Sequence, residues 1–483
     1  MPAKRQPVMN RRSFLQKTLA VPALSTALLS RQASARTAMN TDRRPNLLVI
    51  STDQQFAGAM SCAGNPHLRT PNMDRIARRG TRFDRAYCPN PICVPSRTSY
   101  MTGRLPHETT VTHNTNHHEV VGDCGAAFFR DAGYDTGHVG KWHIPRPLED
   151  REWSGFDYVA ETRSNRVDFD IPAAAAEFLR KPRDNPFLLF TSFVNPHDIC
   201  EWARIASGIE DTLKNGDIPP LPTPEECPPP LPNFEIPSGE PTVIRQHQAE
   251  PGNARTYPVR DWGGAEDGRW RQYLWAYYRM TELVDGFIGE VLDTLEETGQ
   301  ADNTAIVLFS DHGDGMGAHR WNQKTLFYEE CARVPFIVSW PGRTPGGALD
   351  AGRLVNLGTD LFPTLFEIAG IPQPDSMRGL SAAGTAAADA DAPAHPFIVV
   401  ENNLHPRYGE SGIDGRMVRT ERWKYIRFPE GENPEQLFDL ALDPGEMHDL
   451  ATDPGHREVL QHHRRLLNQF IEETNDTFPK TEV

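Results

Sequence analysis

The chain has 483 residues, of which 38% are hydrophobic and 24% are charged. This composition is typical of a soluble globular protein and excludes a disordered or collagen-like chain. The formal net charge is −15, and no basic run interleaved with aromatic residues occurs, so nucleic acid is not expected as a partner. The seven cysteines are scattered without a zinc-ligand spacing. They therefore do not indicate a disulfide framework, and we expect most of them to be buried.

Residues 1–35 have the pattern of a twin-arginine export signal. Arg11 and Arg12 precede a short apolar run over residues 19–29, and Ala33-Ser34-Ala35 offers a small-x-small cleavage site. The alternatives are a basic tail or an uncleaved anchor, but the run is too short and broken for a stable transmembrane helix. We therefore expect an exported protein, periplasmic or extracellular, without a stable membrane span.

Between residues 40 and 380, apolar runs alternate with helical patterns. Strands are expected over residues 46–52, 136–140, 187–194, 304–310 and 334–340. Helices are expected over residues 70–80, 123–133, 172–181, 271–298 and 359–369. This order predicts an α/β domain with a large mixed, mostly parallel sheet sandwiched by helices.

Two regions depart from this pattern. Residues 215–260 are dense in proline and lack periodicity, which predicts one long irregular loop. Residues 381–483 contain several short strand patterns followed by a helical one at residues 457–475, which predicts a smaller α+β subdomain with an antiparallel sheet. Trp202, Trp262 and Trp270 favour either a sugar-binding cleft or ordinary packing, without a preference between the two.

A proline-rich segment leads into a short helix that is expected from about Pro95 to Gly103. Cys93 stands at the mouth of this helix, and Arg97 follows four positions later. A helix N-terminus and a nearby arginine both favour negative charge, so they would activate the cysteine. A buried cysteine in a turn before an ordinary helix is the alternative.

Several predicted strands end in polar side chains. Ligands of open α/β sheets bind beyond the carboxyl ends of the strands, so we expect these side chains to converge. They are Asp53 with Gln54, Lys141 with His143, His197 with Asp198, and Asp311 with His312. The first and last pairs offer mostly oxygen ligands, which suit Ca²⁺ or Mg²⁺. Arg97, Lys141 and Lys324 offer positive charge for a tetrahedral anion, and the histidines can transfer protons.

The words Cys93-Val94-Pro95-Ser96-Arg97 and Thr102-Gly103-Arg104 resemble the signature of the type I sulfatases, in the alkaline-phosphatase-like superfamily. The resemblance extends in order over nearly the whole mature chain. Its further matches are Pro45-Asn46 to Asp53, Thr70 to Asp74, Gly140 to His143, Pro196-His197, Ser310 to Gly313, Lys324, Trp423 to Tyr425 and Leu437 to Leu440.

The resemblance implies that a maturation enzyme oxidises Cys93 to formylglycine. It also implies that Asp53, Gln54, Asp311, His312 and the modified residue 93 hold Ca²⁺. Arg97, Lys141 and Lys324 would bind sulfate oxygens, His197 would be the acid for the leaving group, and His143 would be the base that collapses the intermediate. Gln54 and His312 depart from the Asp and Asn of many members, which lowers the negative charge of the site or alters its geometry.

The function expected on this basis is hydrolysis of sulfate esters, with a sulfated carbohydrate as the first choice of substrate. Two alternatives remain at this point. The same superfamily includes phosphonate monoester and phosphodiester hydrolases with a similar nucleophile and metal pair. A catalytically silent carbohydrate-binding relative is the other, and the intact nucleophilic, acidic and basic set argues against it.

Overall fold

The computed structural model describes residues 44–114, 119–160, 167–210, 212–250, 257–258, 262, 267–403 and 414–483. The predicted export signal lies outside these residues. Residues 44–483 form one compact unit, so the predicted boundary near residue 380 stays a prediction. Among the described residues, we find no helix with the length and apolar character that a membrane span requires.

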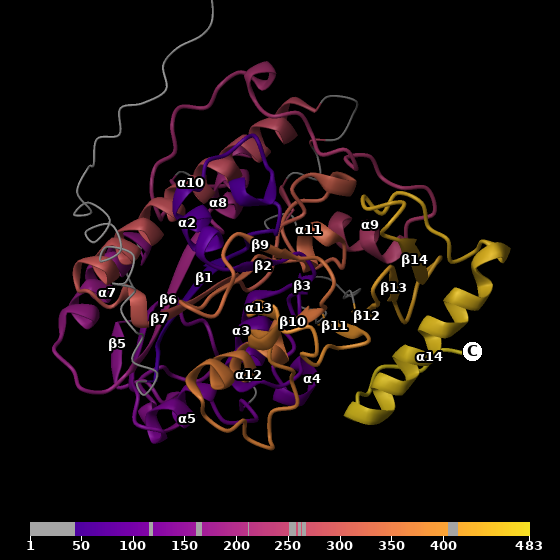
Figure 1. Cartoon of the computed structure of the whole chain (residues 1–483). Coiled ribbons are helices and arrows are strands. Elements are labelled where there is room, and N and C mark those ends of the chain that lie inside the picture. The colour runs from indigo at the N-terminus through magenta and orange to yellow at the C-terminus, as the bar shows by residue number, and fades with distance from the viewer. Residues whose placement is uncertain are drawn as a thin grey trace, which may run out of the picture. The chain divides into compact units, whose positions relative to one another are not determined.

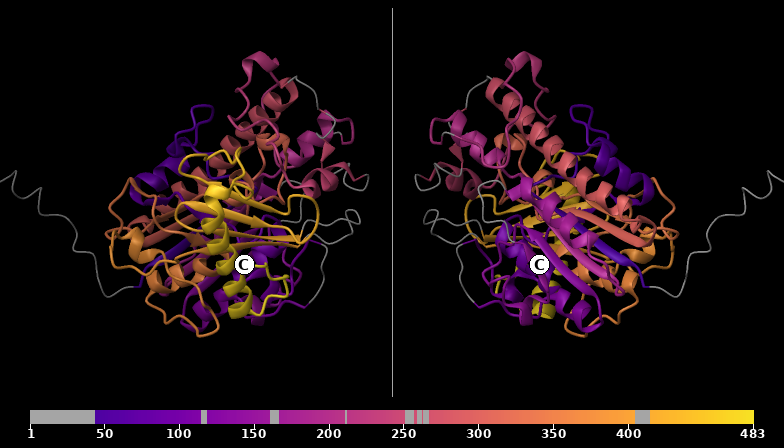
Figure 2. Two further views of the ribbon diagram at one scale, coloured as in Figure 1. Left: turned by 90° about the vertical axis from the view of Figure 1, so that its right-hand side faces the viewer. Right: turned by 90° about the vertical axis from the view of Figure 1, so that its left-hand side faces the viewer.

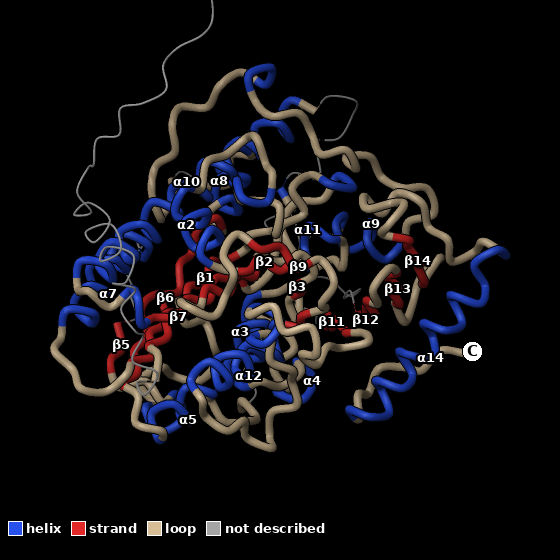
Figure 3. The backbone as a smooth tube through the Cα atoms, viewed as in Figure 1, coloured by secondary structure: helices blue, strands red, loops and turns tan. Residues whose placement is uncertain are grey.

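A mixed sheet of eight strands, in the order β5-β4-β6-β1-β7-β8-β2-β9, is the centre of the fold (Figures 1 and 3). The strands β4, β5, β6, β1 and β7 are parallel to one another, whereas β8 runs antiparallel to both of its neighbours. The bounds are β1 Asn46–Asp53, β2 Thr81–Phe83, β4 Asp135–Gly140, β5 Tyr158–Ala160, β6 Phe187–Pro196, β7 Thr304–Ser310, β8 Phe336–Ser339 and β9 Ala348–Asp350. The predicted sheet type is confirmed.

Helices cover both faces of this sheet. Alternate residues of the central strand β1 point to opposite faces and therefore contact different helices. Leu47 and Val49 of β1 pack with one set of helices, and Leu48 and Ile50 pack with the other. The first set contains α3 Cys93–Thr102, α5 Gly125–Asp131 and α12 Leu357–Ala369. The second contains α2 Pro71–Arg79, α7 Val167–Arg180 and α10 Gly268–Glu297. Figure 1 shows α2 and α10 above the sheet and α3, α5 and α12 below it, and Figure 2 gives two further views of the same arrangement.

The C-terminal part carries a separate antiparallel sheet, as predicted. Its strands are β11 Ile398–Asn403, β12 Asp414–Arg419, β13 Trp423–Arg427 and β14 Glu435–Asp439, in that order. Val418 and Leu437 face the helix α14 Arg457–Thr474. Met417 and Phe438 face the other way, onto Phe327 and neighbouring residues. Because alternate residues point to opposite faces, one face of this sheet packs on α14 and the other packs on the part of the chain that carries the eight-stranded sheet.

The proline-rich region 215–260 is not wholly irregular, which corrects the prediction. It holds the 3-10 turn η2 Pro224–Glu226 and the helix α9 Thr242–Ala249, which ends before the next proline. The remaining short elements are β3 Ala86–Tyr87 paired with β10 Val355–Asn356, α4 Pro106–Thr109, α6 Arg151–Ser154, α8 Ile199–Ala206, α11 Glu329–Ala332, α13 Ala383–Ala386, η1 Ser61–Ala63, η5 Ala301–Asn303, η6 Ala318–Arg320 and η8 Pro454–His456.

A cluster of aromatic side chains joins α8 to α10. Trp202 of α8 and Trp270 of α10 are 7% and 2% exposed, and both pack edge-on against Tyr273. Because they belong to the hydrophobic core, these two tryptophans do not form a platform for a sugar, and packing is the correct interpretation for them. Trp262 is partly exposed and contacts both. The seven cysteines are all free, and six of them are buried.

Candidate active site

The predicted site residues follow four neighbouring strands of the large sheet. In the order β4-β6-β1-β7, the carboxyl ends lead into Lys141, His197, Asp53 with Gln54, and Asp311 with His312. Parallel strands place their carboxyl ends at one edge, so these side chains meet there. The helix α3 and Lys324 complete the group, since both reach the same edge through the contacts described below.

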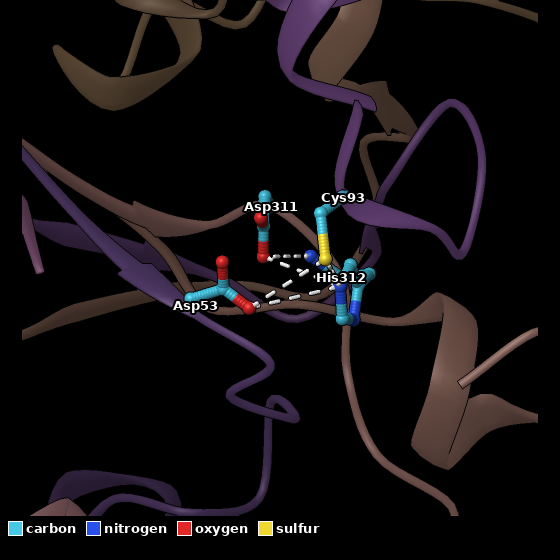
Figure 4. Close-up of side chains that lie close together, drawn as sticks. All are labelled: Asp53, Cys93, Asp311 and His312. Atoms are coloured by element: carbon cyan, nitrogen blue, oxygen red, sulfur yellow. Dashed lines mark hydrogen bonds and ion pairs between the residues drawn. The ribbon is translucent and has the colours of Figure 1, made fainter. Parts of the chain in front are cut away.

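Cys93 is the first residue of α3 and is fully buried. Its Sγ atom lies 3.0 Å from Nζ of Lys324. The same atom lies 3.1 Å from Nε2 of His312, and Figure 4 shows these two side chains next to each other. Burial alone would raise the pKa of the thiol, but Lys324, His312 and Lys141 hold this pKa well below its usual value. The position is therefore electropositive and favours an anionic or electron-rich group.

Arg97 contacts two carboxylates rather than Cys93, the partner that its spacing in the sequence suggests. Its guanidinium is buried and donates to Oδ2 of Asp311 at 2.8 Å and to Oδ2 of Asp53 at 3.0 Å. It also donates to the Lys141 carbonyl and the Ser192 hydroxyl. Because four of its five N–H donors are used in this way, Arg97 fixes the two carboxylates. Lys324, rather than Arg97, is the cation beside the Cys93 sulfur. Contact of Arg97 with sulfate stays a prediction.

Two buried carboxylates face the same point as Cys93 and His312. One ligand atom from each of Asp53, Cys93, Asp311 and His312 lies within 4.8 Å of the others, and Figure 4 shows the four side chains pointing toward one another. Burial and the nearby Asp53 raise the pKa of Asp311. Burial would also raise the pKa of Asp53, but Lys141, His197 and Arg97 hold this pKa well below its usual range. Two such carboxylates suit a divalent cation.

His312 directs its Nε2 atom into this cluster. Burial acts to lower the pKa of the ring, but Asp311 and Cys93 outweigh it and raise this pKa above its usual value. The Nδ1 atom of His312 lies 2.8 Å from the Gly313 carbonyl, which can only accept, so Nδ1 carries a proton. In the neutral ring Nε2 is then unprotonated, and it lies 3.8 Å from Asp53 and 3.7 Å from Asp311. This tautomer, fixed by a backbone carbonyl, is the arrangement that metal-ligating histidines use. The residues present therefore fit a divalent cation.

Gln54 is held by a residue that the sequence analysis missed. The buried carboxylate of Asp314 accepts from Nε2 of Gln54 at 2.7 Å and from the Tyr273 hydroxyl at 2.9 Å. Oε1 of Gln54 is thereby turned to Lys324, whose Nζ donates to it at 3.0 Å. Asp314 stands three positions after Asp311 in the same polar run, and this spacing was its only signal in the sequence. The metal-ligand role of Gln54 stays a prediction.

The two predicted proton-transfer residues lie at the rim. His143 is exposed, with a left-handed backbone (φ 54°). Desolvation is the main cause of the lowered pKa of its ring, and interaction with Cys93 partly offsets this. The His197 side chain is 22% exposed, and its Nδ1 lies 3.9 Å from the carboxylate of Glu201. Both histidines can thus exchange protons with solvent.

A family model described as Sulfatase matches residues 45–371, which include all of these residues. The chain belongs to the sulfatase family. A second model, described as N-sulphoglucosamine sulphohydrolase, C-terminal, matches residues 317–473 of this sulfatase. The two matches overlap over residues 317–371, which include α12.

Characterised relatives share this family. The Delta 4,5-hexuronate-2-O-sulfatase of Bacteroides thetaiotaomicron is 30% identical over 469 residues, which cover 92% of each chain. The solved structure of a 2-O GAG sulfatase matches with a TM-score of 0.79 and 29% identity, over 91% of this chain and 95% of that one. These matches confirm the fold class and show that this sulfatase is a sulfate ester hydrolase.

The phosphonate monoester hydrolase of Agrobacterium radiobacter shares the fold as well. Its structure matches with a TM-score of 0.69 and 22% identity, over 89% of this chain and 96% of that one. At this level of identity the likeness concerns the fold alone. It therefore does not transfer phosphonate chemistry to this sulfatase.

Proposed function

We propose that this sulfatase is an exported enzyme that removes sulfate esters from a carbohydrate of the glycosaminoglycan type. The observation that carries the chemistry is the position of the buried Cys93 sulfur, between Lys324 and His312 and beside two carboxylates. The substrate class is supported by the relatives, one named for a hexuronate 2-O-sulfate and the other for a GAG.

Residue 93 would act as formylglycine, and Asp53, Asp311 and His312, with Gln54, would hold Ca²⁺. Hydrated formylglycine supplies a hydroxyl nucleophile, and its second hydroxyl allows sulfate to be released. The buried Lys324 and the partly exposed Lys141 are placed to neutralise charge on the sulfate oxygens. Arg97 keeps the carboxylates in place. His197 gives a proton to the leaving oxygen, and His143 accepts one when sulfate departs.

The decisive experiment combines mass spectrometry of the Cys93 peptide with activity assays. In protein from a host that has the maturation enzyme, we expect an aldehyde in place of the thiol. Cys93→Ala should reduce hydrolysis of an aryl sulfate by at least about 10³-fold while the fold is kept, because the nucleophile is lost. Cys62→Ala, at a partly exposed cysteine outside the site, is the matched control. An unmodified thiol in fully active enzyme would overturn the proposal.

The substrate class has its own test. Sulfated disaccharides that carry the sulfate at uronate O2 or at glucosamine N2 or O6 should be compared with an aryl sulfate, a phosphonate monoester and a phosphodiester. We expect kcat/KM to be highest for one of the sulfated sugars. A clear preference for the phosphonate or the phosphodiester would replace the proposed substrate by the alternative of the same superfamily.

A further inference from the structure

A carboxylate lies behind the proposed acid, His197. Glu201 is in the first turn of α8, four residues after His197, and it is only 5% exposed. Its Oε2 atom faces Nδ1 of His197 at 3.9 Å. Among the described residues, this oxygen accepts no hydrogen bond, although it is buried. If Oε2 of Glu201 and Nδ1 of His197 moved about 1 Å closer together, they would form a hydrogen bond.

The other oxygen of Glu201 is already occupied. Oε1 accepts from Arg204 at 2.8 Å and lies 3.4 Å from Nζ of Lys214. These contacts fix the carboxylate and leave Oε2 turned toward His197. The neighbouring Asp198 cannot serve in its place, because its carboxylate accepts from the Lys214 and Asn215 backbone N–H groups and from the Asn215 side chain.

The start of α8 is close to the reacting centre. Sγ of Cys200 lies 3.3 Å from Nε2 of Gln54, the residue that follows β1. The charge of His197 also contributes to the low pKa of Asp53, although burial and Cys93 act in the opposite direction. A ring held by Glu201 through Nδ1 would therefore present its other nitrogen, Nε2, to a substrate bound at this edge.

We propose that Glu201 is a positioning residue for His197: it keeps the proton on Nδ1 and stabilises the imidazolium that delivers its Nε2 proton to the leaving oxygen. This inference rests on the proposed role of His197 as acid. In the step, the nucleophile oxygen, which has already lost its proton to solvent, bonds to sulfur while the bond from sulfur to the leaving oxygen breaks. The electron pair of that bond stays on the leaving oxygen, which takes the Nε2 proton. His197 ends neutral, with its Nδ1 proton toward Glu201, and is reprotonated from solvent.

The test uses leaving groups of different quality, because an acid matters most when the leaving oxygen is basic. Full-length, matured enzyme is assayed with an alkyl-type sulfate ester, such as a sulfated sugar, and with 4-nitrophenyl sulfate. We expect Glu201→Gln to lower kcat about 10- to 100-fold on the alkyl ester and less than about threefold on the nitrophenyl ester. A residue with a merely structural role would lower both rates alike.

Three further variants make the result decisive. Glu210→Gln removes the other carboxylate partner of Arg204, at 3.1 Å, and should leave the ratio of the two rates unchanged. Glu201→Asp keeps the charge beside Arg204 but shortens the reach to His197, so it should show an intermediate loss even if the Gln variant does not fold. His197→Ala should show the larger loss on the alkyl ester, and adding Glu201→Gln to it should cost little more.

The outcomes separate the two proposals. If His197→Ala affects both substrates equally, His197 is not the acid and the proposed mechanism fails at that point. If His197→Ala shows the leaving-group dependence but Glu201→Gln and Glu201→Asp do not, only the inference about Glu201 is overturned. Equal losses on both substrates in the Glu201 variants would likewise overturn it.

Discussion

At the scale of single residues, the site depends on how two buried carboxylates are kept together. Asp53 and Asp311 both receive the guanidinium of Arg97, and Asp53 also pairs with Lys141. These cations reduce the repulsion between the carboxylates but lie on one side of them. Nε2 of His312 and residue 93 are on the other side, where a divalent cation would complete the charge balance.

Removal of the metal gives a prediction for this cluster. Dialysis against a chelator should abolish sulfatase activity, and Ca²⁺ should restore it. Ca²⁺ should also stabilise the fold, by about 2.7 kcal/mol at a concentration about 100-fold above Kd, because the cation binds only the folded cluster. Thermal unfolding with and without Ca²⁺ measures this directly.

Asp53→Asn is the matched variant for the metal experiment. It removes one carboxylate charge and keeps the shape, so the Ca²⁺-dependent rise in melting temperature should disappear. An enzyme whose activity and melting temperature are both indifferent to chelation would contradict a metal at this position.

At the scale of elements, His107 joins α4 to the C-terminal sheet. Its Nδ1 lies 2.7 Å from the carboxylate of Glu401 in β11, and Nε2 lies 3.2 Å from the Thr474 carbonyl at the end of α14. Because both partners are acceptors, both ring nitrogens carry protons and the imidazole is charged. Desolvation lowers the pKa of His107, but Glu401 and Asp476 outweigh it and raise this pKa to about 9.

This contact makes the stability of the molecule depend on pH. The folded pKa of about 9 lies above the unfolded value of about 6.5, so the contribution is complete below pH 6.5 and is lost as the pH rises through 9. We expect His107→Gln to lower the free energy of unfolding by on the order of 2 kcal/mol more at pH 6 than at pH 9.5. Urea denaturation at the two pH values measures the difference.

His456→Gln is the control for this experiment, because His456 forms a partly exposed pair with Asp453, 2.8 Å apart, within one turn of chain. We expect little change in stability from this variant at either pH, as is usual for surface pairs. If His107→Gln behaved in the same way, the contact between α4 and the C-terminal sheet would not be an ionic one.

At the scale of the whole molecule, the predicted export signal would decide where the enzyme works. Replacing Arg11 and Arg12 together by lysine should leave the uncleaved precursor in the cytoplasm, because the export machinery reads the arginine pair and not only its charge. Cell fractionation and immunoblotting follow both forms. Arg5→Lys, outside the pair, should not affect export. Normal export of the double variant would exclude a twin-arginine signal.

The sequence predicted most of the large sheet because its central strands are buried on both faces and read as unbroken apolar runs. The three-residue strands β2, β5 and β9 are too short to show a period, and they were missed. The helix α9 was hidden among prolines that flank it without entering it.

For the site, the positions of polar residues at strand ends were visible in the sequence, but their partners were not. The spacing between Cys93 and Arg97 suggested a pair, whereas Arg97 contacts carboxylates that come from strands far away in the chain. Glu201 gave no signal in the sequence, and Asp314 gave only its spacing from Asp311. A lone carboxylate near a histidine or in a polar run is too common to indicate a functional role. Such partners depend on the folded arrangement of separate elements.

The burial of α3 would determine when residue 93 can be modified. Every residue of this helix is buried, and Cys93 and Arg97 have no exposed surface, with Arg97 bound between the two carboxylates. A second protein that must recognise Cys93, Pro95 and Arg97 has no access to them once the chain has folded. Oxidation of residue 93 would therefore come first and folding second, and transport of the folded protein by a twin-arginine route would come last. A molecule that folded too early would carry its thiol permanently.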